Sequence, residues 1–99
     1  MNLRKRVYER TKTIPRGYVT TYKELAHAVN TRAYRAVASA LKNNPDVPAT
    51  PCHRVIKSMR EVGGYLGVKD SAKKRALLQE EGVRFQEDGR VHPKSMHYF

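Results

Sequence analysis

The sequence has no tryptophan, a single cysteine and few acidic residues. One cysteine cannot form an internal disulfide, which excludes a disulfide framework and favours an intracellular location where the thiol stays reduced. No apolar run approaches the ~20 residues of a membrane-spanning helix. The start of the chain also lacks the apolar segment of a secretory signal. We therefore expect a protein of the cytoplasm, nucleoid or nucleus, with no membrane association.

The shortage of acidic residues leaves a strongly basic chain, with a formal net charge of +11. Residues 1–42 carry ten Lys or Arg and two acids, a net +8, whereas residues 43–99 carry ten and seven, a net +3. Such a basic half predicts a polyanionic partner, most often nucleic acid. A generally basic surface is the alternative. The length of 99 residues suits one domain with one modest core, so we expect a single domain over residues 1–99, acting as a monomer.

Apolar spacing and capping residues predict a mainly α-helical fold with a small β component. The expected helices are residues 2–13, 22–29, 33–42 and 71–81. Thr21 followed three residues later by Glu24 matches a capping box, and Thr31 and Asp70 are candidate caps for the two later helices. Residues 53–57 favour a strand, and residues 83–91 favour a terminal hairpin.

Residues 22–29 and 33–42 have the spacing of a helix-turn-helix, which predicts a compact, winged-helix-like domain. The second helix is rich in small residues, which would leave a slim outer face suited to a DNA backbone or a narrow groove. Arg32 and Arg35 lie at its start and Lys42 at its end. An ordinary helical hairpin fits the spacing equally well, but the basic charge of this half favours DNA.

The single cysteine, Cys52, lies in the stretch TPCHRVI and is followed by His53 and Arg54. A free thiol has a pKa of about 8.5 and reacts as the thiolate, so a nucleophilic cysteine needs a base or a nearby positive charge. Neighbouring side chains of a strand point to opposite faces. Contact between Cys52 and His53 therefore needs a bridging water or a turn, which Pro51 favours.

His53 would in turn need an acid to orient it, and Glu80 and Glu81 are candidates that only the fold could bring close. For an isolated Cys-His pair, a cysteine that is buried as a small apolar residue and has no chemical role is the stronger alternative. One cysteine and four histidines lack the paired spacing of a structural zinc site, so we expect no metal.

Five segments, taken in order, resemble the DNA-binding, catalytic domain of the 6-O-alkylguanine-DNA alkyltransferases, or methylated-DNA–protein-cysteine methyltransferases. They are IPRGYVTTYKELA, RAVASALKNNP, PCHRVI, GGYLG and LLQEEGV, within about residues 7–85. The resemblance implies repair of DNA by direct damage reversal without a cofactor. The partner would be double-stranded DNA containing 6-O-alkylguanine, which is flipped out of the duplex and dealkylated once by each protein molecule.

The same resemblance implies a role for each matching position. Cys52 is expected to be the alkyl acceptor, His53 the base that acts through a water, and Glu81 the acid that orients His53. Asn44 would brace the active-site loop, and Tyr22 would contact the target base and help to rotate its phosphate.

The resemblance also implies how DNA is held. Arg35 would fill the gap that the flipped base leaves, while the second helix lies in the minor groove. The other residues that we expect at the DNA are Arg32, Ala36, Lys42 and Arg54. The base pocket would comprise Tyr65, Leu66 and Val55, with the carbonyls of Cys52 and Val55 holding the exocyclic amine of guanine.

The chain departs from the family pattern at several positions. It has no room for the usual additional N-terminal domain, and it has Leu66 where a serine is common and Asp46 and Thr50 in a loop that is usually apolar. A non-enzymatic alkyltransferase-like protein, which flags lesions for other repair machinery, is the main alternative. Such proteins usually carry tryptophan at the position of Cys52. A cysteine hydrolase or a transcriptional regulator explains less of the sequence.

Overall fold

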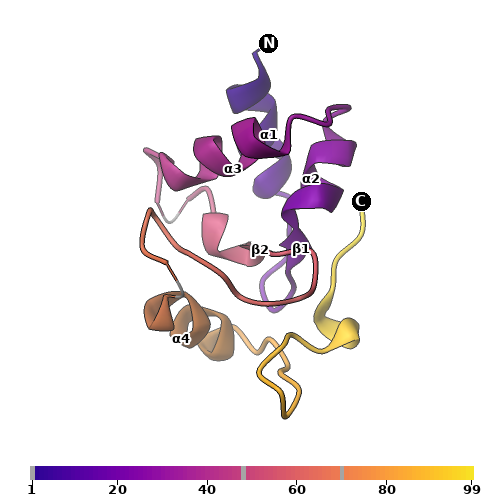
Figure 1. The fold of residues 1–99 in the computed structure, drawn as a ribbon, viewed down its shortest axis with the longest axis vertical. Helices are drawn as coiled ribbons and strands as arrows, with labels where there is room; N and C mark the ends of the chain where they lie inside the picture. The colour runs from indigo at the N-terminus through magenta and orange to yellow at the C-terminus, as the bar shows by residue number, and fades with distance from the viewer. Residues whose placement is uncertain (1, 48, 70) are drawn as a thin grey trace.

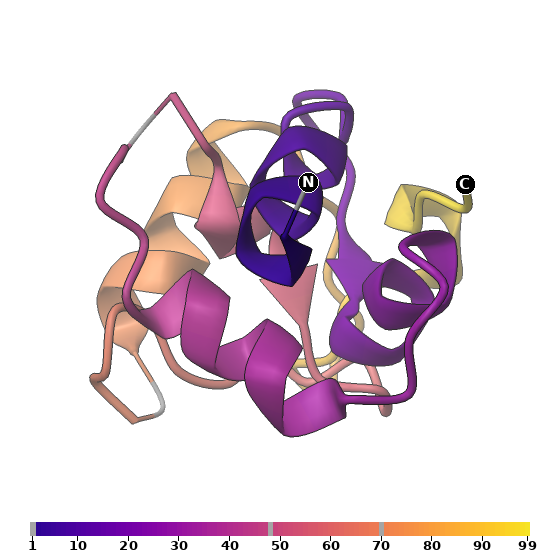
Figure 2. The same cartoon turned by 90° about the horizontal axis from the view of Figure 1, so that it is seen from above.

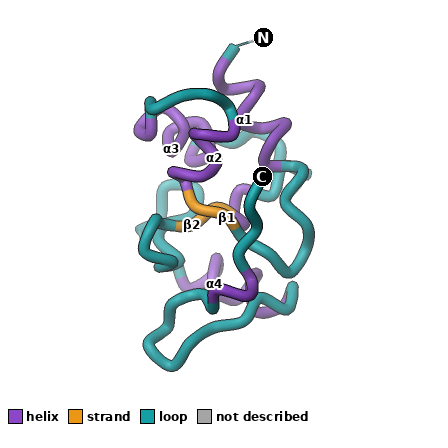
Figure 3. The backbone as a smooth tube through the Cα atoms, turned by 90° about the vertical axis from the view of Figure 1, so that its right-hand side faces the viewer, coloured by secondary structure: helices purple, strands orange, loops and turns teal. Residues whose placement is uncertain are grey.

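The computed structural model describes residues 2–47, 49–69 and 71–99. The elements in chain order are α1 (Leu3–Thr11), β1 (Thr20–Thr21), α2 (Tyr22–Ala28), α3 (Tyr34–Lys42), a 3₁₀ turn (Cys52–Arg54), β2 (Val55–Ile56), α4 (Ala72–Glu80) and a second 3₁₀ turn (Pro93–Ser95). Helices α1, α2 and α3 gather at one end, α4 lies at the other, and the strands lie between them (Figures 1 and 3). The predicted mainly helical fold with a small β component is confirmed.

Side-chain caps start α2 and α4, and one of the three predicted cap residues, Thr21, is confirmed. The Thr21 hydroxyl accepts the Glu24 N–H at 3.1 Å and starts α2, as predicted. Thr31 does not cap α3. Its hydroxyl accepts the N–H of Ala33, and Ala33 is itself the N-cap residue of α3, without a capping hydrogen bond from a side chain. Asp70 lies outside the described residues, and Ser71 caps α4.

The sheet is a parallel pair in which Thr20 is opposite Val55 and Thr21 is opposite Ile56. Parallel strands need a crossover connection, and here the crossover contains α2 and α3. The predicted strand over residues 53–57 is wrong in extent, because a 3₁₀ turn occupies residues 52–54 and leaves two residues of strand. The pairing holds that turn against the segment that leads into α2.

The helix-turn-helix exposes the slim face that its sequence predicts. Helices α1, α2 and α3 pack against one another (Figure 2). The inner face of α3 buries Val37, Ala40 and Leu41, whereas Ala36 and Ser39 are exposed on its outer face. The predicted hairpin also forms, with Phe85 opposite Val91 in an antiparallel bridge. Among the described residues, no helix has the length and apolar character needed to cross a membrane.

Candidate active site

Cys52 lies at the start of the 3₁₀ turn that interrupts the chain before β2. Pro51 stands at the N-terminal end of the turn, and its carbonyl accepts the Arg54 N–H at 3.0 Å. The turn expected at Pro51 is therefore present. It buries Cys52 to 5% exposure, while the thiol still borders a cavity.

His53 is joined to Glu81 by a hydrogen bond of 2.9 Å between Nε2 and Oε2. The side chains are 6% and 9% exposed. Burial alone would raise the pKa of Glu81, but hydrogen bonds and charges from Arg54 and His53 outweigh it and lower the pKa from 4.5 to about 2. An ionised carboxylate only accepts hydrogen bonds, so Nε2 of His53 carries the proton. This leaves Nδ1 as the nitrogen able to accept another.

Arg54 belongs to this buried pair and not to the DNA surface. Its Nε and Nη2 donate to the two oxygens of Glu81 at 2.8 and 2.9 Å, and its Nη1 donates to the carbonyl of Ile14 at 2.9 Å. These bonds do not favour the predicted contact of Arg54 with DNA, because its guanidinium group is already bonded inside the protein. A bidentate arginine fixes both the position and the charge of a carboxylate, so Arg54 holds Glu81 in place for His53.

Asn44 ties together the loop that precedes Cys52. Its Nδ2 donates to the carbonyl of Thr50 at 2.8 Å, and its Oδ1 accepts the N–H of Asp46 at 2.9 Å. Asp46 and Thr50, the two polar departures in this loop, also bond to each other through backbone and side chain, at 2.7 and 3.3 Å. These bonds close the loop on itself directly before Pro51.

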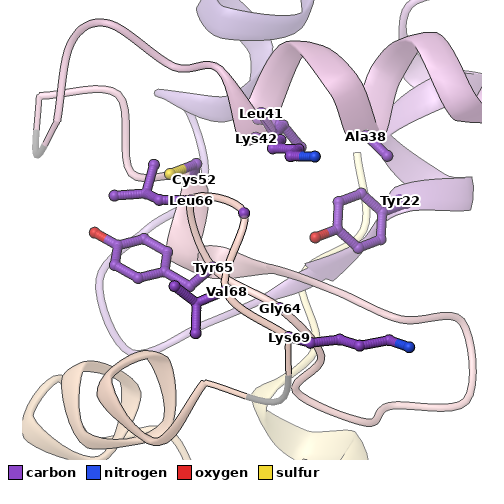
Figure 4. Close-up of a pocket in the computed structure, with 11 residues that line it drawn as sticks. Tyr22, Ala38, Leu41, Lys42, Cys52, Gly64, Tyr65, Leu66, Val68 and Lys69 are labelled. Carbon is purple, nitrogen blue, oxygen red and sulfur yellow. The ribbon is translucent and has the colours of Figure 1, made fainter.

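A cavity of about 240 Å³ lies beside Cys52 (Figure 4). Tyr22 lies across it from Cys52 and Tyr65, and the Tyr22 hydroxyl is turned toward them (Figure 4). Leu66 also lines the cavity. Val55 is not among the lining residues and its side chain is fully buried, while the carbonyl that is expected to hold the guanine amine accepts a hydrogen bond from Lys74 at 2.6 Å. Burial, followed by the charge of Cys52, raises the pKa of both Tyr22 and Tyr65. Each phenol therefore stays neutral and able to donate a hydrogen bond.

The turn that carries Leu66 has an unusual backbone. Tyr65 and Val68 exchange two backbone hydrogen bonds, at 2.8 and 2.9 Å, and the residues between them, Leu66 and Gly67, have φ values of +49° and +85°. Two consecutive positive φ values define a type I′ turn, which favours Asn, Asp or Gly at both central positions. A leucine at the first position is strained, and its side chain remains 40% exposed at the cavity.

The last turns of α3 border the same cavity. Ala38, Leu41 and Lys42 line it from α3, while Arg35 and Ala36 are exposed farther along the helix and Arg32 is exposed just before it. Of the residues expected at the DNA, Tyr22 and Lys42 therefore line the cavity, whereas Arg32, Arg35 and Ala36 are exposed outside it.

Sequence reasoning missed Lys74, which is fully buried near the cavity. It lies four residues before Leu78 and three after Ser71, both of which are buried too. The helical period therefore places position 74 on the inward face of α4. That spacing was the available signal, but the run of basic residues around Lys74 hid it.

The family model described as "6-O-methylguanine DNA methyltransferase, DNA binding domain" matches residues 2–83. The methylated-DNA–protein-cysteine methyltransferase of Saccharolobus solfataricus is 46% identical over 82 residues, covering 82% of this chain and 51% of that protein. The methylated-DNA–protein-cysteine methyltransferase of Archaeoglobus fulgidus is 41% identical over 83 residues, covering 80% of this chain and 55% of that protein. The chain thus spans about half the length of the curated relatives it matches.

Two solved structures resemble the fold across most of the chain. Mycobacterium tuberculosis OGT in complex with DNA has a TM-score of 0.74 and 37% identity, covering 83% of this chain and 50% of that one. S. pombe Atl1 in complex with damaged DNA containing O6-carboxymethylguanine has a TM-score of 0.81 and 28% identity, covering all of both chains. The similarity to Atl1 therefore extends over the whole of both chains.

Proposed function

The chain belongs to the 6-O-methylguanine DNA methyltransferase family, and from this premise we propose that it is a DNA alkyltransferase in its own right. Residues 1–99 would form one domain that takes the alkyl group from 6-O-alkylguanine in double-stranded DNA onto Cys52, once per molecule. The observation that carries this proposal is the arrangement of Cys52 at a cavity, directly followed by a histidine that a buried carboxylate orients.

The proton path follows from the hydrogen bonds. Because Glu81 fixes the proton of His53 on Nε2, Nδ1 takes up the thiol proton of Cys52 through a water, and the thiolate is the nucleophile. The sulfur then bonds to the alkyl carbon as the carbon–oxygen bond breaks, and that electron pair passes to the guanine oxygen. Tyr22, whose neutral hydroxyl is turned into the cavity, donates a hydrogen bond to the leaving guanine. The proton that Nδ1 of His53 accepted then passes through water to the guanine anion, so guanine leaves as the neutral base and His53 is again neutral.

The product on the protein is a thioether, which has no activated bond that water can hydrolyse. A thioether also differs from a disulfide in that it does not exchange with thiols, so the alkyl group stays on Cys52. We therefore infer that the protein is consumed stoichiometrically, with one lesion repaired by each molecule.

The alkylated base must leave the stack before the buried thiol can reach it. The exposed small residues of α3 suit close contact with a minor groove, and Arg35 extends from the same exposed face. In this arrangement Arg35 takes the place of the flipped base, while Arg32 and Lys42 neutralise phosphates and Tyr65 and Leu66 hold the base beside Cys52.

A second function is supported by the similarity to Atl1, which extends over the whole of both chains. In that reading the chain binds alkylated guanine and flags it without removing the alkyl group. The retained Cys52, with His53 and Glu81 bonded behind it, favours transfer instead, because lesion binding alone requires no oriented base.

Intact mass spectrometry separates the two functions. The folded protein is incubated with duplex DNA containing one 6-O-methylguanine, and peptide mapping follows to locate any added mass. We expect one methyl group per protein, on Cys52, and none on Cys52→Ala, which should still bind the lesion duplex. Lesion-selective binding by a wild-type protein that gains no methyl mass would replace transfer by the flagging function.

A further inference from the structure

A second hollow, of about 480 Å³, opens on the surface and is about twice as large as the cavity of about 240 Å³ beside Cys52. It lies between the start of α2, the start of α3 and the turn formed by residues 57–61. Among the described residues, Tyr22 alone lines both spaces, so it forms a wall between them. We call the second space the Tyr34 hollow. The proposed alkyl transfer gives it no role.

Tyr34 supplies an exposed aromatic ring to this hollow. It is the first residue of α3, and it is 39% exposed although most of its side chain is apolar. Its hydroxyl shares a hydrogen bond of 2.9 Å with Nε2 of His27, and the two rings meet edge to face with their centres 5.8 Å apart. The ring is thus tied to α2, which gives the hollow a flat apolar surface that is already in place.

Met59 gives the hollow a second exposed apolar side chain. It is 60% exposed in a turn whose ends are joined by the Lys57 N–H and the Glu61 carbonyl at 3.0 Å. Arg60 fixes this turn to the terminal hairpin, because its carbonyl accepts the Val91 N–H at 2.9 Å and its Nη1 donates to the Val91 carbonyl at 3.1 Å. Large apolar side chains that gather at one hollow are typical of a binding surface.

The charges at the Tyr34 hollow favour an anionic partner. Lys23 and Lys57 both line it and are exposed, and neither forms an ion pair within the described residues. Glu61 is the acidic residue of the lining, so the two lysines leave an excess of positive charge. An aromatic ring beside cations is the combination that binds unpaired nucleotides, because the ring stacks on a base and the cations attract the phosphates.

We propose that the Tyr34 hollow is a second base-binding subsite, which holds the base next to the lesion when 6-O-alkylguanine lies in single-stranded DNA. The proposal rests on the proposed function for the place of the lesion itself. If the alkylated base occupies the cavity beside Cys52, the strand crosses Tyr22 and brings the adjoining nucleotide to the Tyr34 hollow.

The gain from this subsite depends on the form of the DNA. In a duplex the adjoining base is stacked and paired, and moving it onto Tyr34 would cost that stacking and pairing. In a single strand the base has little to lose, so stacking on Tyr34 adds directly to affinity. Arg35, the next residue of α3, has the opposite preference, because the gap that it is proposed to fill exists only in a duplex.

The test measures binding by fluorescence anisotropy in a Cys52→Ala background, using a short oligonucleotide with one 6-O-methylguanine, as a single strand and as a duplex. Tyr34→Ala should weaken binding to the single strand about tenfold and to the duplex less than about twofold. Arg35→Ala should show the reverse pattern. Tyr34→Phe keeps the ring and should bind like its parent. Tyr98→Ala, which removes an exposed tyrosine of the C-terminal tail, should change neither affinity.

Removal of the neighbouring base tests the stacking itself. Single strands with an abasic site directly 5′ or 3′ of the lesion keep the phosphates but lack one possible partner of Tyr34. On one of these two strands, Tyr34→Ala should cost no affinity.

A loss that persists on both abasic strands, a larger loss on the duplex than on the single strand, or no binding to the single strand would each overturn the subsite. Intact mass spectrometry of the wild type on the same oligonucleotides tests the proposed function separately. If binding follows the expected pattern but Cys52 gains no methyl group, the proposed transfer fails and the subsite is retained.

Discussion

Glu81 accepts a hydrogen bond from His53 at 2.9 Å although 28 positions separate the two residues in the chain. The relationship depends on α4, which ends at Glu80 and delivers the next residue to the 3₁₀ turn. Arg54, beside His53 in the sequence, completes the contact by binding both carboxylate oxygens. The histidine is thus oriented by a carboxylate that is itself held in place.

Glu81→Gln tests this relationship through pH. The pKa of Glu81 is about 2 in the folded protein and 4.5 without its partners. Its ionised form therefore contributes stability above pH 4.5, and this contribution is lost as the pH falls toward 2. The difference corresponds to roughly 3 kcal/mol. We expect Glu81→Gln to lower the free energy of unfolding at pH 7 by about that much and to reduce its decline between pH 4.5 and 2, as measured by urea denaturation.

The same substitution should slow alkyl transfer by about a hundredfold or more, because His53 loses its orienting carboxylate. Glu80→Gln is the matched control, since Glu80 is exposed and directly precedes Glu81. If Glu80→Gln cost as much stability and rate as Glu81→Gln, the assignment of Glu81 would be wrong.

Glu80 and Glu81 show what the residue pattern alone does not determine. Residue types and spacing predicted the helices and the Thr21 cap, and Pro51 favoured a turn at Cys52, because each depends on a few neighbouring residues. Which of two adjacent glutamates reaches His53 depends on the angle at which α4 leaves the core, and spacing alone does not contain that angle. The family resemblance supplied the choice of Glu81, and the hydrogen bond supports it.

Arg54 and Lys74 illustrate a second limit. Both are basic residues in a basic chain, and sequence analysis treated Arg54 as part of the DNA surface and gave Lys74 no role. Their burial depends on long-range partners: Ile14 and Glu81 for the arginine, and Val55 and Gly64 for the lysine. A charge pattern predicts where positive residues are abundant, but it does not predict which of them are drawn into the core.

Asn44→Ala should destabilise the loop before Cys52. The substitution removes the bonds to Thr50 and Asp46 and leaves the N–H of Cys52 as the donor that remains to the Thr50 carbonyl. The loss of two hydrogen bonds costs about 1–3 kcal/mol. Asn43→Ala is the control, because Asn43 is exposed and its side chain bonds only within the last turn of α3. Thermal unfolding of the two variants measures the difference. Equal losses of stability would mean that Asn44 does not brace the loop.

Leu66→Asn should stabilise the protein. A non-glycine residue in the left-handed region costs about 1–2 kcal/mol, and asparagine is favoured at the first central position of a type I′ turn. Because Leu66 is 40% exposed, the substitution removes little buried apolar surface. We expect a gain of about 1 kcal/mol, which corresponds to ~4–8 °C in Tm for a domain of this size.

The opposite substitution at the same position provides the control for Leu66. Valine is β-branched and is disfavoured at positive φ, so Leu66→Val should lower the Tm although it preserves the apolar character of the pocket. Calorimetry of the two variants measures both Tm values. If asparagine and valine changed the Tm in the same direction, backbone strain at Leu66 would not be the cause.

Arg35→Ala should separate base flipping from general DNA affinity. Arg35 is exposed on the outer face of α3, where the proposed function places it in the gap left by the flipped base. Without it the unstacked state loses its replacement partner, and flipping costs a few kcal/mol. In a Cys52→Ala background, which prevents dealkylation, we expect about tenfold weaker binding to a duplex with 6-O-methylguanine and a much smaller loss on undamaged duplex.

Arg84→Ala, which removes an exposed arginine outside the helix-turn-helix, should weaken both complexes slightly and equally. Fluorescence anisotropy at several salt concentrations measures both affinities, and equal losses on the two duplexes for Arg35→Ala would reduce its role to phosphate binding.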